Sequence, residues 1–315
     1  MRPERGPGTG EAQHLCSSNG ASQILVVLTG TGSSRGLHTG TTSIEQYVHM
    51  EPTNAPPLDP YSPELGDVRL ATAIWATAVG GVPFDVPRAM HQVTVFNGPT
   101  EDFTFDTPSA IALHLNSAWK AAVRASSYKA AIGTSSHRAE PGRSASSVNA
   151  DSVPPLFDYF EEMLTVAFSS YAAVEAFCNS SVVEKATGPL RIKARKGKPP
   201  TLLPEEVERQ IGTGEKLGRI VPNLFGLPSP SGKSVWGSFL KLEDLRNEVV
   251  HFKRRGQAGN ALTGGTAEPT VLHRLYECDP FSLPEAAVAV IKYFYPKVGT
   301  APRWLMNPTW VRPKV

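Results

Sequence analysis

Apolar residues recur at the spacing of an α-helix through most of the second half of the chain. Between positions 233 and 254 they follow i, i+3, i+4 spacing, which places them on one helix face: Leu242, Leu245, Val249 and Phe252. The same spacing predicts three more helices, at about 155–181, 204–222 and 284–295. Because each helix has an apolar face to bury, we expect residues 155–297 to form a helical bundle.

The first hundred residues are less regular. Residues 1–22 are polar and lack periodicity, so we expect a disordered leader. Residues 23–106 predict a small mixed α/β region, whose role the sequence does not reveal. Within that region two apolar runs flank a turn at 97–100, which indicates a β-hairpin.

The segments that flank the bundle differ in character. Residues 107–131 predict an amphipathic helix with one apolar side: Ile111, Leu115, Trp119 and Ala122. Residues 132–154 are rich in Ser, Gly, Pro and charge, and we expect a flexible linker. Residues 298–315 form a tail with tryptophans among prolines. The predicted fold class is therefore mainly α, a helical bundle with a small N-terminal β-containing region.

Composition excludes some functions. The chain has 315 residues and a formal net charge of +2, so no overall basicity points to a nucleic-acid partner. Cys16, Cys178 and Cys278 are widely separated and lack zinc-site spacing, so we expect no metal and no cofactor, with Cys178 in the core. No apolar run reaches the roughly 20 residues of a membrane span, and we expect a cytoplasmic protein without a membrane partner.

The most informative segment lies at the end of the helix predicted at 233–254. It combines Arg246, a permanently charged group suited to phosphate, with the polar Asn247 and with His251, whose imidazole titrates near neutral pH. These are the groups of a small RNA-cleaving site. At about 100° per residue Arg246 and His251 stand roughly 140° apart on an ideal helix, with Arg246 at the edge of the apolar stripe. One chain is therefore expected to carry half a site, which a two-fold homodimer completes.

A simpler interpretation of the same residues stays open. Cations followed by a glycine, here Lys253, Arg254, Arg255 and Gly256, are typical of a helix C-terminus. A histidine on an outer helix face is usually an ordinary surface residue, and an arginine beside an apolar stripe often lays its stem over the core.

The arrangement of these residues resembles the HEPN (higher eukaryotes and prokaryotes nucleotide-binding) domain family. The shared motif is an Arg, a polar residue and a His five positions after the Arg at the end of an apolar helix, matched by Arg246, Asn247 and His251. Residues 171–179 are similar to the first long helix of that family, and residues 214–222 to its connecting helix. The resemblance covers about residues 150–297.

The resemblance implies a metal-independent endoribonuclease of the toxin or defence type, acting as a dimer on RNA, with an antitoxin protein as a further partner. In this interpretation the RNA 2′-hydroxyl attacks the adjacent phosphorus, His251 transfers protons and Arg246 stabilises the charge on the phosphoryl oxygens. Asn247 orients the phosphate or the ring. Some members of the family bind nucleotides, RNA or proteins without catalysis, and this alternative remains open.

Glu175 interrupts an otherwise apolar helix and is expected to support the site. A carboxylate near a core tends to be paired, and Arg246 is its predicted partner across two helices. A salt bridge that only fixes helix register, or a solvent-facing Glu175, are the alternatives.

Two basic clusters are candidates for RNA backbone contacts, with solvated loops as the alternative. The first precedes two prolines and the second follows the motif: Arg191, Lys193, Arg195, Lys196 and Lys198, then Lys253, Arg254 and Arg255. In the first cluster, charges alternate with Leu190, Ile192 and Ala194, which predicts a short strand or hairpin arm beside the bundle.

Overall fold

A computed structural model of the whole chain gives the fold. The structure describes residues 25–28, 62, 65–79, 82–97, 102–140, 143–193, 200–251, 270–296, 301–306 and 310. This part of the chain is mainly helical, as predicted, and the predicted leader at 1–22 lies outside it.

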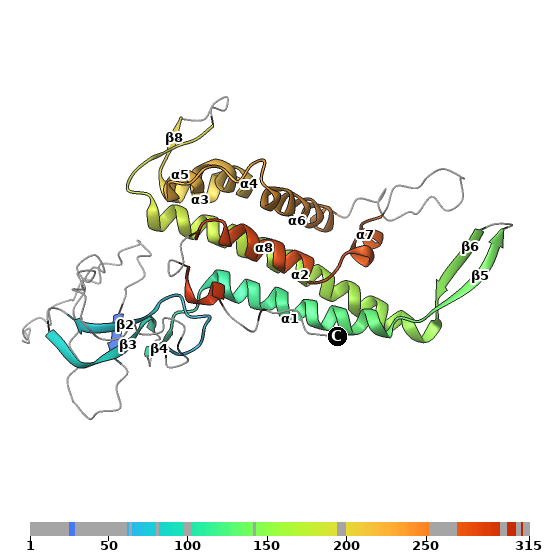
Figure 1. Cartoon of the computed structure of the whole chain (residues 1–315), viewed down its shortest axis with the longest axis horizontal. Helices are drawn as coiled ribbons and strands as arrows, with labels where there is room; N and C mark the ends of the chain where they lie inside the picture. Colours follow the sequence, from blue (N-terminus) through green and yellow to red (C-terminus); the bar gives the residue numbers. More distant parts are fainter. Residues whose placement is uncertain are drawn as a thin grey trace, which may run out of the picture.

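Two long helices form the base of the bundle. Helix α1 spans Ala110–Ala131 and helix α2 spans Val153–Lys185, and the two lie side by side along their lengths (Figure 1). They run antiparallel, since Arg124 Nε donates to Glu162 Oε1 at 2.6 Å while Ser117 near the start of α1 meets Ser169. Close approach is possible because the facing positions of α1 are small and fully buried: Ala112, Ala118, Ala121, Ala122 and Ala125.

The amphipathic helix predicted at 107–131 is confirmed. Helix α1 begins after Ser109, whose hydroxyl accepts a hydrogen bond from the Ala112 backbone N–H at 3.3 Å and caps the first turn. The four residues predicted on its apolar side are all buried: Ile111, Leu115, Trp119 and Ala122.

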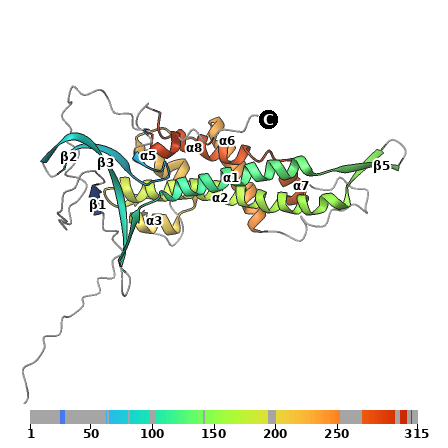
Figure 2. The same cartoon turned by 90° about the horizontal axis from the view of Figure 1, so that it is seen from below.

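The predicted linker at 132–154 is wrong. Strands β5 (Thr134–Glu140) and β6 (Arg143–Val148) pair antiparallel and project beyond the ends of α1 and α2 (Figures 1 and 2). The base of this hairpin is tied to the helices, because Gly133 N donates to Ser152 Oγ at 2.9 Å and Asn149 N to Gly133 O at 3.0 Å. Its serine-rich composition suggested a linker, yet backbone pairing needs no apolar side chains.

Four shorter elements cover α2 near its C-terminal end. They are α3 (Pro204–Gln210), α4 (Thr213–Glu215), the π-helical turn η4 (Lys216–Ile220) and α5 (Val221–Phe225). One continuous helix was expected at about 204–222, and this is wrong: the backbone is extended at Ile211 and Gly212. The break turns the Ile211 side chain into the core, where it is buried.

The remaining helices complete the bundle. Helix α6 spans Ser234–Val250, and α8 (Ser282–Lys292) packs against both α2 and α6 (Figure 1). Both were predicted, with somewhat longer bounds. Helix α7 (Val271–Glu277) was not expected; its N-cap Thr270 accepts a hydrogen bond from the His273 backbone N–H. Helix α7 also pairs with α6 through Arg274 and Glu248.

An antiparallel sheet lies at the other end of α1 from the hairpin (Figure 1). The long strand β3 (Val82–Asn97) pairs with β1 (Leu25–Leu28), β2 (Ala73–Val79) and β4 (Asp102–Asp106). The hairpin predicted around 97–100 is confirmed by the β3–β4 register, in which Asn97 lies opposite Asp102.

Two further strands are very short and lie beside the bundle. Strands β7 (Leu190–Arg191) and β8 (Thr201–Leu202) pair antiparallel, which confirms the short hairpin predicted there. Ile192 and Leu202 are buried against the bundle.

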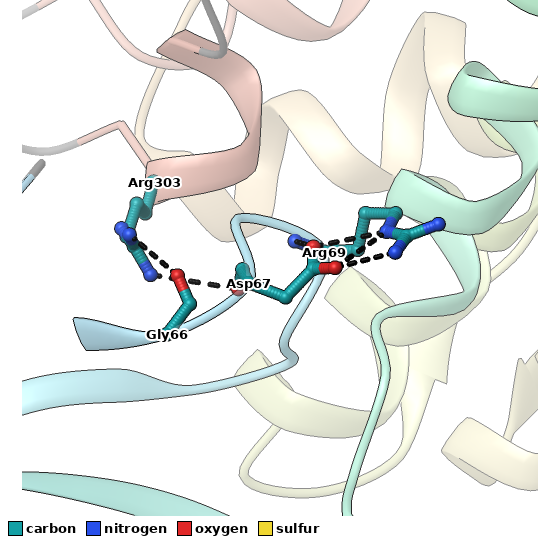
Figure 3. Close-up of polar contacts among 4 residues, drawn as sticks. All are labelled: Gly66, Asp67, Arg69 and Arg303. Carbon is teal, nitrogen blue, oxygen red and sulfur yellow. Dashed lines mark hydrogen bonds and ion pairs between the residues drawn. The ribbon is translucent and has the colours of Figure 1, made fainter. Parts of the chain in front are cut away.

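The C-terminal segment packs back onto the chain. Its 3₁₀ turn η6 (Arg303–Met306) buries Trp304 and Leu305. The Arg303 guanidinium donates to backbone carbonyls before the sheet, at 2.8 Å to Ser62 and at 3.0 Å to Leu65. It also donates to the Gly66 carbonyl at 2.8 Å (Figure 3).

The turn that accepts hydrogen bonds from Arg303 is also stabilised by an ion pair of its own, between Arg69 and Asp67. Gly66 adopts φ +80°, a backbone conformation that favours glycine. A hydrogen bond from the Arg69 side chain lowers the pKa of the Asp67 carboxyl to about 2 (Figure 3). The C-terminal segment and the start of the sheet are thus held as one unit.

We expect Arg303→Ala to lower the free energy of unfolding by about 2–3 kcal/mol, since several carbonyl groups, two of them in partly buried hydrogen bonds, lose a charged donor. Arg303→Lys should lose about half as much, because one ammonium cannot span these carbonyls. The matched control is Arg69→Ala, which breaks only a surface ion pair worth about 0–1 kcal/mol. Urea unfolding followed by tryptophan fluorescence measures all three, and equal losses for the two alanine variants would contradict the assigned role.

Candidate phosphate-binding site

Helix α6 carries the predicted motif on the border between its buried and exposed faces. Its buried face consists of Phe239, Leu242, Leu245 and Val249. Arg246 is partly buried and Asn247 is exposed, so the prediction that Arg246 lies at the edge of the apolar stripe is confirmed. A guanidinium in this position packs against the protein on one side and is accessible from solvent on the other.

The Arg246 guanidinium is held on an aromatic ring of α2. Its Cζ lies 4.8 Å from the centroid of the Tyr171 ring, and its Nη1 donates to Asn247 Oδ1 at 3.0 Å. A cation over a tyrosine face is stabilised by about 0.5–1 kcal/mol at an exposed site. These two contacts orient the guanidinium without neutralising its charge.

Tyr171 is itself fixed by packing. Its ring stacks on Phe239 with centroids 6.4 Å apart, and its hydroxyl donates to Glu243 Oε1 at 3.4 Å. Burial raises the pKa of the Tyr171 phenol, while a hydrogen bond with Thr213 acts in the opposite sense. The phenol therefore stays protonated and acts as a donor at physiological pH. No sequence pattern predicted this residue as part of the site.

The predicted ion pair between Glu175 and Arg246 is not formed in the part of the chain that the structure describes. Arg246 reaches the Tyr171 ring instead, which lies one helical turn before Glu175 on α2. The Glu175 carboxylate acts electrostatically on Tyr171, on Cys178 and on Lys216. Glu175 therefore acts on neighbouring groups of α2 and η4 rather than as the partner of Arg246.

Lys216 is a buried residue that the sequence analysis missed. Only 1% of its surface is exposed, and its Nζ donates to Asn179 Oδ1 and to the Glu208 carbonyl, both at 2.6 Å. Burial lowers the pKa of the Lys216 ammonium. Lys216 opens the π-helical turn, a geometry that recurs at functional sites. In sequence it does not differ from a surface lysine.

Cys178 is close enough to Lys216 for the two groups to interact electrostatically. Its predicted place in the core is confirmed. It is fully buried, and burial raises the pKa of its thiol to about 12. The thiol is therefore not a nucleophile at physiological pH.

His251 follows the last helical residue instead of lying within the helix. Its backbone N–H donates to the Asn247 carbonyl at 3.0 Å, and its φ of −107° and ψ of 52° turn the chain out of α6. The side chain is exposed. Within the described residues no contact joins its imidazole to Arg246, so one chain brings Arg246 and Asn247 together but not His251.

The basic residues predicted to bind RNA are described only in part. Arg191 and Lys193 are exposed beside the β7–β8 hairpin, and Lys193 N donates to Glu215 Oε1 at 3.1 Å. The other predicted contacts lie outside the described residues: Arg195, Lys196, Lys198, Lys253, Arg254 and Arg255.

Metal centres and membrane spans are two other kinds of site that a helical chain could carry. Among the described residues no group of three or more His, Cys, Asp or Glu side chains is arranged to hold a metal ion. No helix of the described part has the length and apolar character needed to span a membrane. Comparison with family models, curated proteins and solved structures finds no match to this chain.

We expect Lys216→Met to lower the free energy of unfolding by about 1–3 kcal/mol at neutral pH, because two partly buried oxygen acceptors lose their donor. The exposed lysine of α1 provides the control, Lys120→Met, which should change stability by less than about 0.5 kcal/mol.

The difference in the free energy of unfolding between the parent and Lys216→Met should depend on pH. The pKa of Lys216 is lower in the folded chain than in the unfolded chain, so the parent gains stability as pH rises from that lowered pKa toward the ordinary value of 10.5. The deficit of Lys216→Met should therefore widen in alkaline buffer. Urea unfolding at several pH values measures it, and a deficit that shrinks would contradict the buried, charged lysine.

Proposed function

We propose that this protein binds RNA and cleaves it as a metal-independent endoribonuclease of the HEPN type. The observation that carries the proposal is the environment of Arg246. Its guanidinium is partly exposed, oriented by Tyr171 and Asn247, and in ion-pair contact with no carboxylate of the described residues. An arginine that is held in place but not neutralised suits a phosphate ligand.

The proposed reaction uses the RNA itself as nucleophile. The 2′-oxygen attacks the adjacent phosphorus, the bond to the 5′-oxygen breaks, and the products are a 2′,3′-cyclic phosphate and a 5′-hydroxyl. Arg246 stabilises the negative charge that builds on the phosphoryl oxygens. His251 transfers protons through its imidazole ring. Asn247 keeps the guanidinium in position.

The separation of Arg246 and His251 within one chain supports a homodimer. Two α6 helices related by a two-fold axis would place the Arg246 of one chain near the exposed end of the other, where His251 lies. Each of the two sites would then take its arginine and its histidine from different chains.

The order of elements along the chain supports the proposed relationship to the HEPN domain family. A long helix with an acid and an asparagine (α2), a connecting segment (η4) and a helix ending in Arg-Asn-x3-His (α6) follow one another as in the resemblance described above. A toxin or defence role in the cytoplasm, held in check by an antitoxin protein, follows from that kinship.

A second candidate is a module of the same helical type that grips RNA or a nucleotide without cutting it. The exposed position of His251, away from Arg246, favours this alternative if the chain acts as a monomer.

We expect Arg246→Ala and His251→Ala each to reduce cleavage of mixed RNA by at least about 10²-fold in the presence of a chelator, since charge stabilisation and proton transfer each contribute that much. Lys241→Ala, an exposed lysine of the same helix, is the matched control and should cleave like the parent. Gel assays of RNA length measure the rates. Parent protein that binds RNA but never cuts it would leave only the non-catalytic alternative.

A mixture of the two inactive variants tests the shared site. Half of the randomly formed dimers contain one chain of each kind, and each such dimer holds one intact site of two. Activity should therefore return to about one quarter of the parent value. No recovery, despite exchange of subunits, would show that both groups act from one chain.

RNA affinity should depend on salt, because phosphate contacts release counterions. Arg191→Ala combined with Lys193→Ala should weaken binding of all sequences alike and reduce the slope of log affinity against log salt by about 1 for each phosphate-binding cation removed. Lys120→Ala on α1 provides the control. An affinity that does not change between low and high salt would exclude the proposed basic contacts.

A further inference from the structure

Glu243 shares the face of α6 that carries Arg246 and Asn247. It precedes Arg246 by three residues and Asn247 by four, the two spacings that bring helix side chains together. Glu243 and Arg246 are both partly buried, and both contact Tyr171, one through the hydroxyl and the other through the ring face. Tyr171 thus positions a carboxylate and a guanidinium side by side.

The Glu243 carboxylate and the Arg246 guanidinium are neighbours but do not neutralise each other's charge. No ion pair joins Glu243 to Arg246 in the described part of the chain, so the carboxylate keeps acceptor capacity beyond the Tyr171 hydrogen bond. The carboxylate faces the backbone of α4 at Gly214, which carries no side chain. A Cβ added there would touch both carboxylate oxygens, at 3.6 and 3.7 Å.

The surroundings of Glu243 favour the protonated form of its carboxyl more than water does. Burial raises the pKa of its carboxyl, and the Asp244 charge acts in the same sense. The Tyr171 hydrogen bond and Arg246 oppose that rise. The charged and titratable groups that act on Glu243 therefore come from α2 and from α6 itself. A carboxyl whose pKa lies above its ordinary value accepts a proton more effectively than an exposed one.

We infer that Glu243 is the proton acceptor of the phosphodiester cleavage, a catalytic residue beside Arg246 in the same chain. This inference rests on the proposed ribonuclease function. The Glu243 carboxylate takes the proton of the RNA 2′-hydroxyl as the 2′-oxygen forms its bond to phosphorus. The bond from phosphorus to the 5′-oxygen breaks, and the leaving oxygen takes a proton from the His251 imidazolium of the second chain. Proton exchange with water restores both groups.

The two roles, proton acceptance by Glu243 and proton donation by His251, explain why these residues lie far apart along α6. Arg246 and Glu243 act on the attacking side of the phosphate from one chain, whereas His251 acts on the leaving side. A site with two proton-transfer groups needs them on opposite sides of the phosphorus, because attack and departure are in line. The separation of His251 from Arg246 is then a requirement of the chemistry.

The test is Glu243→Gln, which retains an oxygen acceptor for the Tyr171 hydroxyl but cannot take a proton. At pH 7 we expect kcat to fall by about 10²-fold or more, with RNA affinity within about threefold of the parent. The parent kcat should fall as pH decreases through the raised pKa of Glu243, and this acid limb should be absent from the residual activity of Glu243→Gln. Glu243→Asp keeps a carboxylate but, because its side chain is one methylene shorter, holds it farther from the phosphate. This variant should retain the acid limb at an intermediate rate.

The matched control is Glu248→Gln, which removes one carboxylate from the same helix outside the site. It should preserve both the rate and the acid limb. If Glu243→Gln cleaves like the parent, or keeps the acid limb, the inference is overturned while a loss of cleavage in Arg246→Ala still supports the ribonuclease. If the parent cleaves no RNA, both the inference and the proposed function are overturned. Thermal denaturation of each variant separates loss of chemistry from loss of fold.

Discussion

The contact between the Tyr171 ring and helix α6 is the constraint on which the candidate site depends. Phe239 stacks on the ring, Glu243 accepts a hydrogen bond from its hydroxyl, and Arg246 lies over its face. These three side chains come from successive turns of α6, so a slip of the helix by one turn would remove all three contacts at once. The same contacts set the register of the two helices and the direction of the guanidinium.

Helix α2 holds the elements around that site through a few buried polar groups. The Tyr159 hydroxyl donates to the Leu275 carbonyl at 2.8 Å and so anchors α7. Near the other end, Asn179 accepts from Lys216 and anchors the π-helical turn. A buried polar group without a partner costs about 1–3 kcal/mol, so such bonds favour one arrangement of the short helices over others that apolar packing alone would allow. Tyr171 lies between these two anchors on α2.

Hydrogen bonds to backbone groups help to attach two elements outside the bundle. The β5–β6 hairpin is tied at its base through Gly133 and Ser152, and the C-terminal segment is tied to the turn before the sheet through Arg303 and Gly66. Because these ties are hydrogen bonds to main-chain atoms, composition alone did not predict them. The serine-rich hairpin was expected to be a linker for that reason.

The sequence by itself determined the helices whose apolar stripes are long, such as α1 with Leu115 and Trp119, and it placed Arg246 correctly at the edge of a buried face. Such features follow from local periodicity, which a single segment contains in full. Only the tertiary structure decided which residues meet: that Arg246 lies on Tyr171 rather than beside Glu175, that Lys216 is buried, and that Glu243 joins the site. These pairings depend on how distant segments pack, and the periodicity of one segment contains no information about its partner.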